Sequence, residues 1–220
     1  MQRALVIGTS GGIGAALVAA LSARGVAVTT LSRSADGLDL TSQASVDRAL
    51  SRVEGPFDLV LITSGILAAK GKRPEKSLSA IDAASMAEVM AVNAIGPALI
   101  LRHAARLLPK SERSVFAVLT ARVGSIGDNG LGGWYSYRAA KAAANQIVHT
   151  AAIEIARQRK LAVVVALHPG TVETPFTKGY PGHRKVTPDE AARNILSVLD
   201  GLTPAETGGF FDWAGERVPW

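Results

Sequence analysis

Hydrophobic positions follow two patterns along the chain: short continuous apolar runs and longer amphipathic stretches. The short runs predict strands, because each is bounded by Gly, Pro, Ser or Asp. We place strands at residues 4–8, 26–32, 59–63, 115–120 and 161–168, with a further short strand at 209–212. The amphipathic stretches predict helices at 13–24, 43–53, 84–108, 134–159 and 187–199. Strands that alternate with helices are typical of a parallel sheet covered on both faces.

The predicted strands are apolar at consecutive positions, as in Leu59 to Ile62, rather than at every second position. This pattern predicts strands that are buried on both faces. With right-handed crossovers, it predicts a doubly wound parallel α/β sheet, a Rossmann-type fold of about seven strands. Because no linker, repeat or low-complexity segment divides the chain, we expect residues 1–220 to form one domain that carries both binding and catalytic residues.

The absence of cysteine excludes disulfides, thiolate metal sites and cysteine nucleophiles. A glycine cluster that begins at Gly8 interrupts the first apolar run, so we expect no secretory signal. No run approaches the roughly 20 apolar residues that cross a bilayer, so we expect a cytoplasmic protein with no membrane partner. We also expect no metal site, since no metal-ligand spacing relates the histidines, which are His103, His149, His168 and His183.

The formal net charge is +6, but the basic residues are scattered. The densest group lies in a loop that contains Gly and Pro, and it consists of Lys70, Lys72, Arg73 and Lys76. This distribution predicts a solvated surface and no nucleic-acid partner. A nucleic-acid binder is the alternative that the charge alone supports. A mildly basic field also favours a cofactor with several phosphates.

Glycines gather where the first predicted strand meets the first predicted helix, in the sequence Gly8-Thr9-Ser10-Gly11-Gly12-Ile13-Gly14. Missing side chains expose backbone N–H groups, and the helix N-terminus adds a partial positive charge. A pyrophosphate is the natural ligand of such a turn, although the spacing differs from GxGxxG. The alternative is a glycine-rich turn that serves tight helix packing.

This turn resembles the cofactor signature TGxxxGxG of the short-chain dehydrogenase/reductase family, with Ile7 in place of the usual Thr. The resemblance extends over nearly the whole chain. It implies a bound dinucleotide, and the residues that it implies for binding in the first half of the chain are Gly8, Ser10, Gly12, Ile13, Gly14, Asp39, Leu40, Ser64 and Gly65. Asp39 has an alternative role as a turn residue. Thr63 and Ser64 replace two asparagines of the family pattern, so either Thr63 braces the central sheet by other means or the strand is looser.

The second predicted strand ends in Leu31-Ser32-Arg33-Ser34, where enzymes that prefer NAD usually place an acidic side chain. A guanidinium pairs bidentately with a 2′-phosphate, so Arg33 favours NADP over NAD. An exposed surface arginine is the alternative.

Tyr137 and Lys141 lie four residues apart in a predicted helix, which places both side chains on one face. An adjacent ammonium stabilises a phenolate, so this pair is suited to general acid–base chemistry. The alternative is a core tyrosine beside a surface lysine. The resemblance implies that Tyr137 and Lys141 also belong to the cofactor site, where Lys141 binds the nicotinamide ribose.

The family uses a serine after the fifth strand to hold the substrate oxygen. The usual Ser-Ser pair is Thr120-Ala121 here, and we choose Ser125 for the role, with Thr120 as the other candidate and a turn serine as the alternative. The resemblance implies that Asn93 anchors a water beside the lysine, whereas a buried amide satisfied by backbone is the alternative. We expect Pro97 to bend this helix.

After the sixth strand the family pattern implies a carboxamide site, for which the matching residues are Pro169, Gly170, Val172 and Thr174. Within the family the chain is most similar to a branch called C-factor-like, on the evidence of residues 122–129 and the end Val218-Pro219-Trp220. Three aromatic residues indicate a partly apolar pocket, or else local packing: Trp134, Phe176 and Tyr180.

The resemblance implies an oxidoreductase that transfers a hydride between NADP(H) and a small carbonyl or alcohol substrate. Tyr137 would be the general acid–base group. The alternative is a dinucleotide-binding signalling protein with little catalysis. By resemblance we expect a homodimer or homotetramer.

Overall fold

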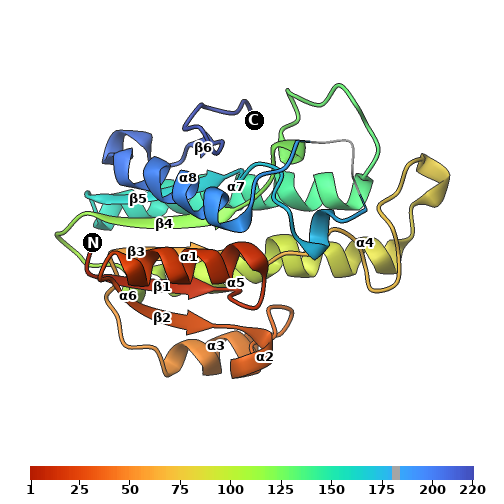
Figure 1. Ribbon diagram of the computed structural model, residues 1–220. Helices are drawn as coiled ribbons and strands as arrows, with labels where there is room; N and C mark the ends of the chain where they lie inside the picture. The colour runs from red at the N-terminus through yellow and green to blue at the C-terminus, as the bar shows by residue number, and fades with distance from the viewer. Residues whose placement is uncertain (180–183) are drawn as a thin grey trace.

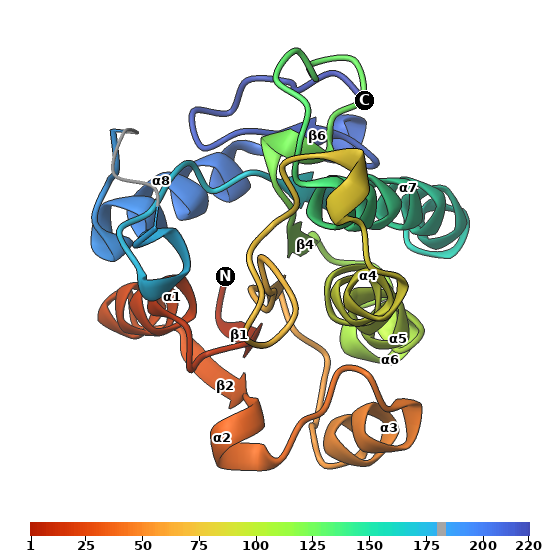
Figure 2. The same cartoon turned by 90° about the vertical axis from the view of Figure 1, so that its right-hand side faces the viewer.

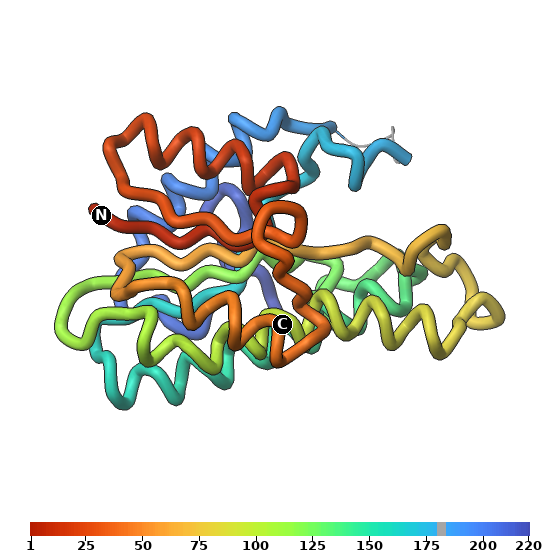
Figure 3. Tube along the Cα trace, turned by 90° about the horizontal axis from the view of Figure 1, so that it is seen from below, coloured from red at the N-terminus to blue at the C-terminus, as the bar shows by residue number. Residues whose placement is uncertain are grey.

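The structure is a computed structural model, and it describes residues 1–179 and 184–220. A six-stranded parallel sheet lies between two layers of helices (Figures 1 and 3). The strand order is β2-β1-β3-β4-β5-β6. The strands are β1 (Arg3–Ile7), β2 (Ala27–Leu31), β3 (Leu59–Ile62), β4 (Ser114–Leu119), β5 (Ala162–Leu167) and β6 (Phe210–Phe211). The helices are α1 (Gly12–Ala23), α2 (Arg33–Asp36), α3 (Gln43–Ser51), α4 (Ala83–Met90), α5 (Gly96–Leu101), α6 (Ala104–Leu107), α7 (Tyr135–Gln158) and α8 (Pro188–Gly201).

The sheet is buried on both faces, as its continuous apolar runs predict. Successive residues of β1 belong to different cores: Leu5 packs with α3, α5 and α7, while Val6 packs with α1 and α8. Figure 2 shows the same division, with α1 and α8 on one side of the strands and α3, α5 and α7 on the other. Each fully buried Leu or Ile side chain stabilises the fold by roughly 1.5–3 kcal/mol.

The sheet has six strands among the described residues rather than about seven. Residues 32–42 contain only the one-turn helix α2, a left-handed Gly37 and a turn, before α3 begins at Gln43. A parallel crossover needs a dozen or more residues, so no further strand forms beside β2. As a result β2 is an edge strand, and only Leu31 of its residues is fully buried. The segment around Asp39 therefore does not follow a strand.

The helix expected at 84–108 is broken at two places. A π-helical turn at Ala91–Ile95 separates α4 from α5, and the chain turns again between α5 and α6. Pro97 is the second residue of α5, where a missing N–H is tolerated. The distortion expected at Pro97 is therefore present as a change of helical hydrogen-bond register just before it.

The run Ala83–Leu101 has 19 helical residues and a mean hydropathy of 1.6, enough by length and composition to cross a membrane. Glu88, Asn93 and Pro97 interrupt the run, so it is not a continuous apolar stretch. Inside the protein, 39% of the run is buried, and it packs against α7. The fully buried Asn93 lies within it. The apolar residues of this run thus have a partner in the fold itself.

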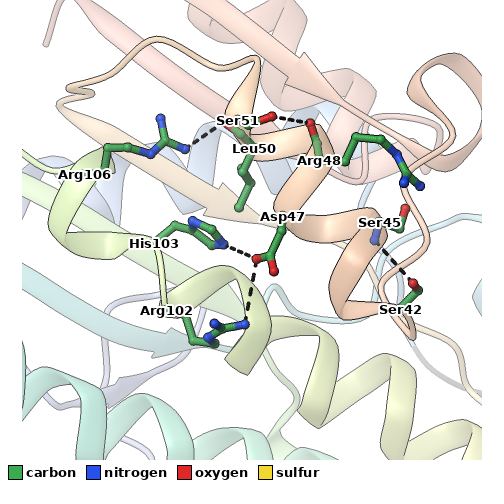
Figure 4. Close-up of polar contacts among 9 residues, drawn as sticks. All are labelled: Ser42, Ser45, Asp47, Arg48, Leu50, Ser51, Arg102, His103 and Arg106. Atoms are coloured by element: carbon green, nitrogen blue, oxygen red, sulfur yellow. Dashed lines mark hydrogen bonds and ion pairs between the residues drawn. The ribbon is translucent and has the colours of Figure 1, made fainter.

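Polar contacts fix α3 to the junction between α5 and α6 (Figure 4). His103 Nε2 lies 2.8 Å from Asp47 Oδ1, and Arg102 Nη1 lies 3.8 Å from the same oxygen. The hydrogen bond with His103 lowers the pKa of Asp47. Arg106 Nη2 donates to Leu50 O at 2.7 Å, which satisfies a carbonyl in the last turn of α3.

Thr63 joins β1 to β3 just beyond the last residues of the two strands. Its N–H donates to Ile7 O at 2.8 Å. Its hydroxyl donates to Ile7 O at 2.9 Å and to Gly8 O at 3.2 Å. Thr63 therefore provides the brace of the central sheet for which the sequence offered no asparagine.

Thr63→Val removes this hydroxyl with little change of shape. We expect it to lower the free energy of unfolding by about 1 kcal/mol, because the side-chain hydrogen bonds at the sheet centre are lost. Urea unfolding followed by circular dichroism measures the effect, and Thr150→Val, at an exposed position of α7, is the matched control. Equal unfolding free energies for the two variants would show that the brace carries no stability.

Candidate active site

The strand order reverses between β1 and β3, and loops from several strands gather at the carboxyl ends there. Figure 2 looks onto this edge of the sheet, where the loops after β1, β3, β4 and β5 converge. In open α/β sheets, ligands bind in the crevice at such a point. Most of the predicted site residues lie in these loops and at the starts of the helices that follow them.

The glycine turn after β1 leaves no room for a side chain at Gly8 or Gly14. Gly8 has a φ of +100°, and an added Cβ there would lie 2.7 Å from Ser64 N and 2.8 Å from Thr63 Oγ1. An added Cβ at Gly14 would lie 2.5 Å from Gly8 O. The first turn of α1 has no side-chain cap and no acidic residue. The turn thus offers backbone N–H groups and a helix dipole to an anion.

The loop after β5 comes against this turn. An added Cβ at Gly12 would lie 2.9 Å from Thr174 Cγ2, so Thr174 borders the start of α1. Gly170 has a φ of +81° and faces the ring of Trp213. Val172 is buried, whereas Ser10 is exposed and Ile13 and Pro169 are partly buried. The structure therefore brings the predicted carboxamide segment beside the predicted pyrophosphate turn.

At the sheet edge, Arg33 is exposed and begins α2 directly after β2. Asp39 Oδ1 accepts hydrogen bonds from Thr41 N at 2.9 Å and from Thr41 Oγ1 at 2.7 Å. These bonds, and to a lesser degree the charge of Arg33, lower the pKa of Asp39. The Leu40 side chain is buried and packs beside Gly96. Asp39 thus has the turn role that the sequence left open, on the same side of the sheet as Arg33.

Tyr137 and Lys141 are both buried on one face of α7. Lys141 Nζ donates to Leu119 O, the last carbonyl of β4, at 2.9 Å, and lies 5.8 Å from the centre of the Tyr137 ring. Burial lowers the pKa of Lys141 to about 8, since it disfavours the charged form. Burial raises the pKa of Tyr137, so in this state it opposes the lowering that we expected from the lysine.

Asn93 lies in the π-helical turn and ties it to the loop after β3. Its Oδ1 accepts from Ile66 N at 3.0 Å, and its Nδ2 donates to Ile66 O at 2.7 Å. The amide is therefore satisfied by backbone, which is the alternative that the sequence left open. Gly65 lies between two predicted site residues, because an added Cβ would be 2.8 Å from Asn93 Oδ1 and 3.5 Å from Lys141 Nζ.

The hydroxyl expected for the substrate oxygen has two candidates. Ser125 is buried, and its Oγ accepts a hydrogen bond from Asp128 N at 3.0 Å, as a turn serine does. Thr120 Oγ1 is buried without a hydrogen-bond partner in the part of the chain that the structure describes. Ala121, between them, packs in an apolar cluster with Tyr137 and Ala140.

Two residues near Tyr137 were not singled out for catalytic positioning by sequence reasoning. Glu75 is buried and accepts hydrogen bonds from both the N–H and the hydroxyl of Ser136. Burial favours its neutral form, but the hydrogen bonds from Ser136 outweigh burial and keep the pKa of Glu75 below its ordinary value. Trp134 has a φ of +54°, in the left-handed region. The glycine pair before Trp134 indicates such a turn in the sequence. Glu75 lies in a loop among other charged residues, so nothing in the sequence distinguishes it.

His168 follows β5, and its Nδ1 is buried without a hydrogen-bond partner among the described residues. Burial lowers the pKa of His168 to about 4, although the charge of Asp212 acts in the opposite direction. With this lowered pKa, His168 is neutral at pH 7. In the described parts of the chain, no group of three or more His, Asp or Glu side chains is placed to hold a metal ion.

The sheet and its two helix layers define a Rossmann-type α/β fold, with the glycine turn and the Tyr137–Lys141 pair at one edge. The sequence profile of the family described as Enoyl-(Acyl carrier protein) reductase matches residues 37–210. The 1-hydroxy-2-glutathionyl-2-methyl-3-butene dehydrogenase of Rhodococcus sp. (strain AD45) is 31% identical over 236 aligned residues and covers 100% of both chains. The C-signal protein of Myxococcus xanthus is 36% identical over 169 residues, which cover 76% of this chain and 94% of that protein.

Solved structures share the fold. The NADPH-bound carbonyl reductase from chicken fatty liver matches with a TM-score of 0.86 at 23% identity, covering 100% of this chain and 94% of that one. A short-chain dehydrogenase/reductase from Burkholderia multivorans with bound NADP matches with a TM-score of 0.81 at 24% identity, covering 100% and 99%. The chain belongs to the short-chain dehydrogenase/reductase family and is an oxidoreductase of that type. The predicted likeness to the C-factor-like branch is confirmed.

The buried amino group of Lys141 predicts a pH dependence of stability. Its pKa is about 8 in the folded protein and near 10.5 when unfolded, so between these values the unfolded chain binds more protons. The free energy of unfolding of the wild type therefore rises with pH through this window. Lys141→Met lacks this contribution.

Relative to the wild type, we expect Lys141→Met to lose on the order of 2 kcal/mol of stability between pH 8 and pH 10. Above pH 10 the raised pKa of Tyr137 acts in the opposite direction, so the measurement stops there. Urea unfolding at several pH values measures the difference. Lys160→Met, at an exposed position, is the control. Parallel curves for wild type and Lys141→Met would contradict the lowered pKa.

Proposed function

We propose that the protein reduces an uncharged carbonyl compound with NADPH, with Tyr137 as the general acid. The observation that carries this proposal is the Tyr137–Lys141 pair, buried on one face of α7, with Lys141 Nζ close to the loop that holds Gly65. That loop also supplies Ser64, which borders the Gly8 turn. One edge of the sheet therefore presents an anion-binding turn and a proton donor together.

The residues of this edge are suited to a dinucleotide. Added Cβ atoms at Gly8 and Gly14 would collide with the protein's own chain, so these glycines let the turn pack closely against the loop after β3, and the uncapped start of α1 beside them would bind the pyrophosphate. Ser64 and Gly65 would border the ribose, and Lys141 would hydrogen-bond it. Thr174 and the backbone of Val172 would hold the carboxamide. The bound NADPH would supply the hydride that adds to the carbonyl carbon.

The protein's own part of the reaction is the proton. The Tyr137 hydroxyl donates its proton to the carbonyl oxygen as the carbon is reduced, and a phenolate remains on the tyrosine. The Lys141 ammonium, 5.8 Å from the ring centre, stabilises that phenolate by charge. The attraction between the ammonium and the phenolate is stronger because the buried site excludes water, which lowers the local dielectric constant. Solvent then returns the proton to Tyr137.

Ser125 orients the carbonyl oxygen in this proposal, with Thr120 as the second candidate. Asp128 N donates to Ser125 Oγ, which leaves the serine O–H to donate to a substrate oxygen. The unpartnered hydroxyl of Thr120 lies at the end of β4, one residue before Ala121. Comparison of Ser125→Ala with Thr120→Val would identify the residue whose loss lowers kcat.

Arg33 selects NADPH over NADH in this proposal. It is exposed at the end of β2, where a guanidinium pairs bidentately with a 2′-phosphate. The bound NADP and NADPH in the two solved structures of the same fold support the choice.

Tyr137→Phe tests the chemical role. We expect kcat for a carbonyl substrate to fall at least about 100-fold, since the proton donor is lost. The Kd of NADPH, measured by nicotinamide fluorescence, should change less than about threefold, because the phenolic oxygen contributes little to cofactor affinity compared with the rest of the site. Tyr135→Phe, two residues earlier, is the control. Full turnover by Tyr137→Phe would remove the proposed mechanism.

Arg33→Ala tests the cofactor choice. We expect the Kd of NADPH to rise about 10- to 100-fold and the Kd of NADH to stay the same, because only NADPH carries the phosphate that Arg33 pairs with. Titration at one low salt concentration measures both constants. Arg52→Ala, at an exposed position after α3, is the control. An equal loss of affinity for both cofactors would contradict the assigned role.

A signalling role with little catalysis is the second candidate, and the similarity to C-signal favours it. Replacement of the usual Ser-Ser pair by Thr120-Ala121 points the same way. In that case the protein would bind NADPH, yet a broad panel of aldehydes and ketones would give no oxidation of the bound nucleotide. Steady turnover of any member of the panel would exclude this candidate.

A further inference from the structure

Two aromatic rings flank the ring of Tyr137. The Trp134 ring centre lies 6.2 Å away with the planes 69° apart, and the Phe176 ring centre lies 5.9 Å away at 58°. Trp134 comes directly before α7, whereas Phe176 belongs to the 3₁₀ turn Pro175–Thr177 after β5. Phe176 is 39% exposed, so part of its ring faces solvent. Side chains from two different loops thus border the approach to Tyr137.

The other surroundings of Tyr137 are apolar as well. It belongs to a cluster with Val89, Ala121 and Ala140. The partly buried residues that pack against this cluster are Ile66, Leu67, Met90, Val123 and Trp134. One charged group also lies near the Tyr137 ring: Lys141 Nζ, 5.8 Å from the ring centre, which donates a hydrogen bond to Leu119 O.

Two further charged side chains of nearby loops, Glu75 and Arg138, make hydrogen bonds within the protein. The Glu75 carboxylate accepts from Ser136 N and Ser136 Oγ. Arg138 donates to Gly133 O at 3.0 Å and to Val123 O at 3.1 Å. Both serve to hold loops in place, and neither is left to recognise a substrate charge.

The backbone at Trp134 is strained. Gly132, Gly133 and Trp134 have φ values of +64°, +65° and +54°, three successive left-handed residues of which the last is not glycine. Several contacts hold this turn, among them hydrogen bonds from Trp134 N to Glu75 O at 2.5 Å, from Gly132 N to Asn129 Oδ1 at 3.1 Å and from Arg138 Nε to Gly133 O at 3.0 Å. Such outliers persist where the surroundings over-determine them, and they cluster at functional sites.

We propose that Trp134 and Phe176 form an aromatic clamp that makes the enzyme select carbonyl compounds with a planar, uncharged aromatic substituent. The two rings hold the substituent while its carbonyl oxygen faces the Tyr137 hydroxyl. Flat rings pack well against aromatic side chains in tilted and edge-to-face arrangements. Glu75 and Arg138 are positioning residues that keep Trp134 in its strained conformation. This inference rests on the proposed reductase function.

Trp134→Gly is the most direct test, because glycine adopts a φ of +54° without strain, so the variant loses the ring but keeps the turn. The rates to compare are kcat/KM with NADPH for acetophenone, cyclohexyl methyl ketone, 2-butanone and pyruvate. We expect the wild type to prefer acetophenone. In Trp134→Gly the kcat/KM for acetophenone should fall at least about tenfold relative to that for 2-butanone. Trp134→Phe should retain most of the preference.

Leu78→Ala, at a position that is 71% exposed, is the control and should leave the preferences unchanged. Phe176→Leu removes the second ring of the clamp and should also reduce the preference for acetophenone. A wild type that prefers pyruvate or 2-butanone, or an unchanged ratio in Trp134→Gly, would overturn the clamp while leaving the reductase function intact.

A second readout covers the case in which NADPH binds but no ketone is reduced. Saturable binding of acetophenone to the NADPH complex, measured by calorimetry and weakened at least about tenfold in Trp134→Gly, would still support the clamp. Absence of such binding would overturn it. Failure to bind NADPH would contradict the reductase function, and the clamp, which depends on that function, would be contradicted as well.

Discussion

The buried amino group of Lys141 is the constraint around which the site is arranged. A cation removed from water needs compensation, and the described structure provides one hydrogen bond, to Leu119 O at the end of β4. A Cβ added at Gly65 would lie 3.5 Å from Lys141 Nζ. A Cβ added at Gly124 would lie 2.8 Å from the backbone carbon of Lys141, so Gly124 packs directly against that residue. The strand end, two loops and α7 are therefore fixed relative to one another by the space that one lysine requires.

The loops after β1 and β3 are fixed to each other by close approach of their backbones, as the end of β4 and α7 are fixed by Lys141. Gly8 lies so near Thr63 and Ser64 that no side chain fits between β1 and β3. Thr63 then ties the two strands with its hydroxyl. Asn93 makes side-chain hydrogen bonds to backbone in the same way: its amide binds both the N–H and the carbonyl of Ile66, in the loop after β3. Side chains that bond to backbone thus shape this edge more than side chains that bond to each other.

The periodicity of the sequence predicted the strand positions, the burial of both sheet faces and the helix that carries Tyr137 and Lys141. These features depend on local pattern, and the structure has them. The missing strand beside β2 depends on how few residues follow Leu31, and the π-helical turn on a buried Asn93; neither leaves a periodic signal.

Tertiary contacts limited prediction of the site in the same way. Ser125 was chosen by its place in the chain, but its hydroxyl binds its own turn while Ala121 packs with Tyr137. Glu75 acts through Ser136, 61 residues later, a partnership that no local pattern announces. The strain at Trp134 is likewise a property of the folded loops rather than of the local sequence.

The central claim is that one edge of the sheet holds NADPH beside Tyr137, and a crystal structure of the NADPH complex tests it most directly. We expect the pyrophosphate to lie over the turn from Gly8 to Gly14 and the nicotinamide ribose to lie within hydrogen-bond distance of Lys141 Nζ. A nucleotide bound elsewhere, or a nicotinamide ring turned away from Tyr137, would contradict it.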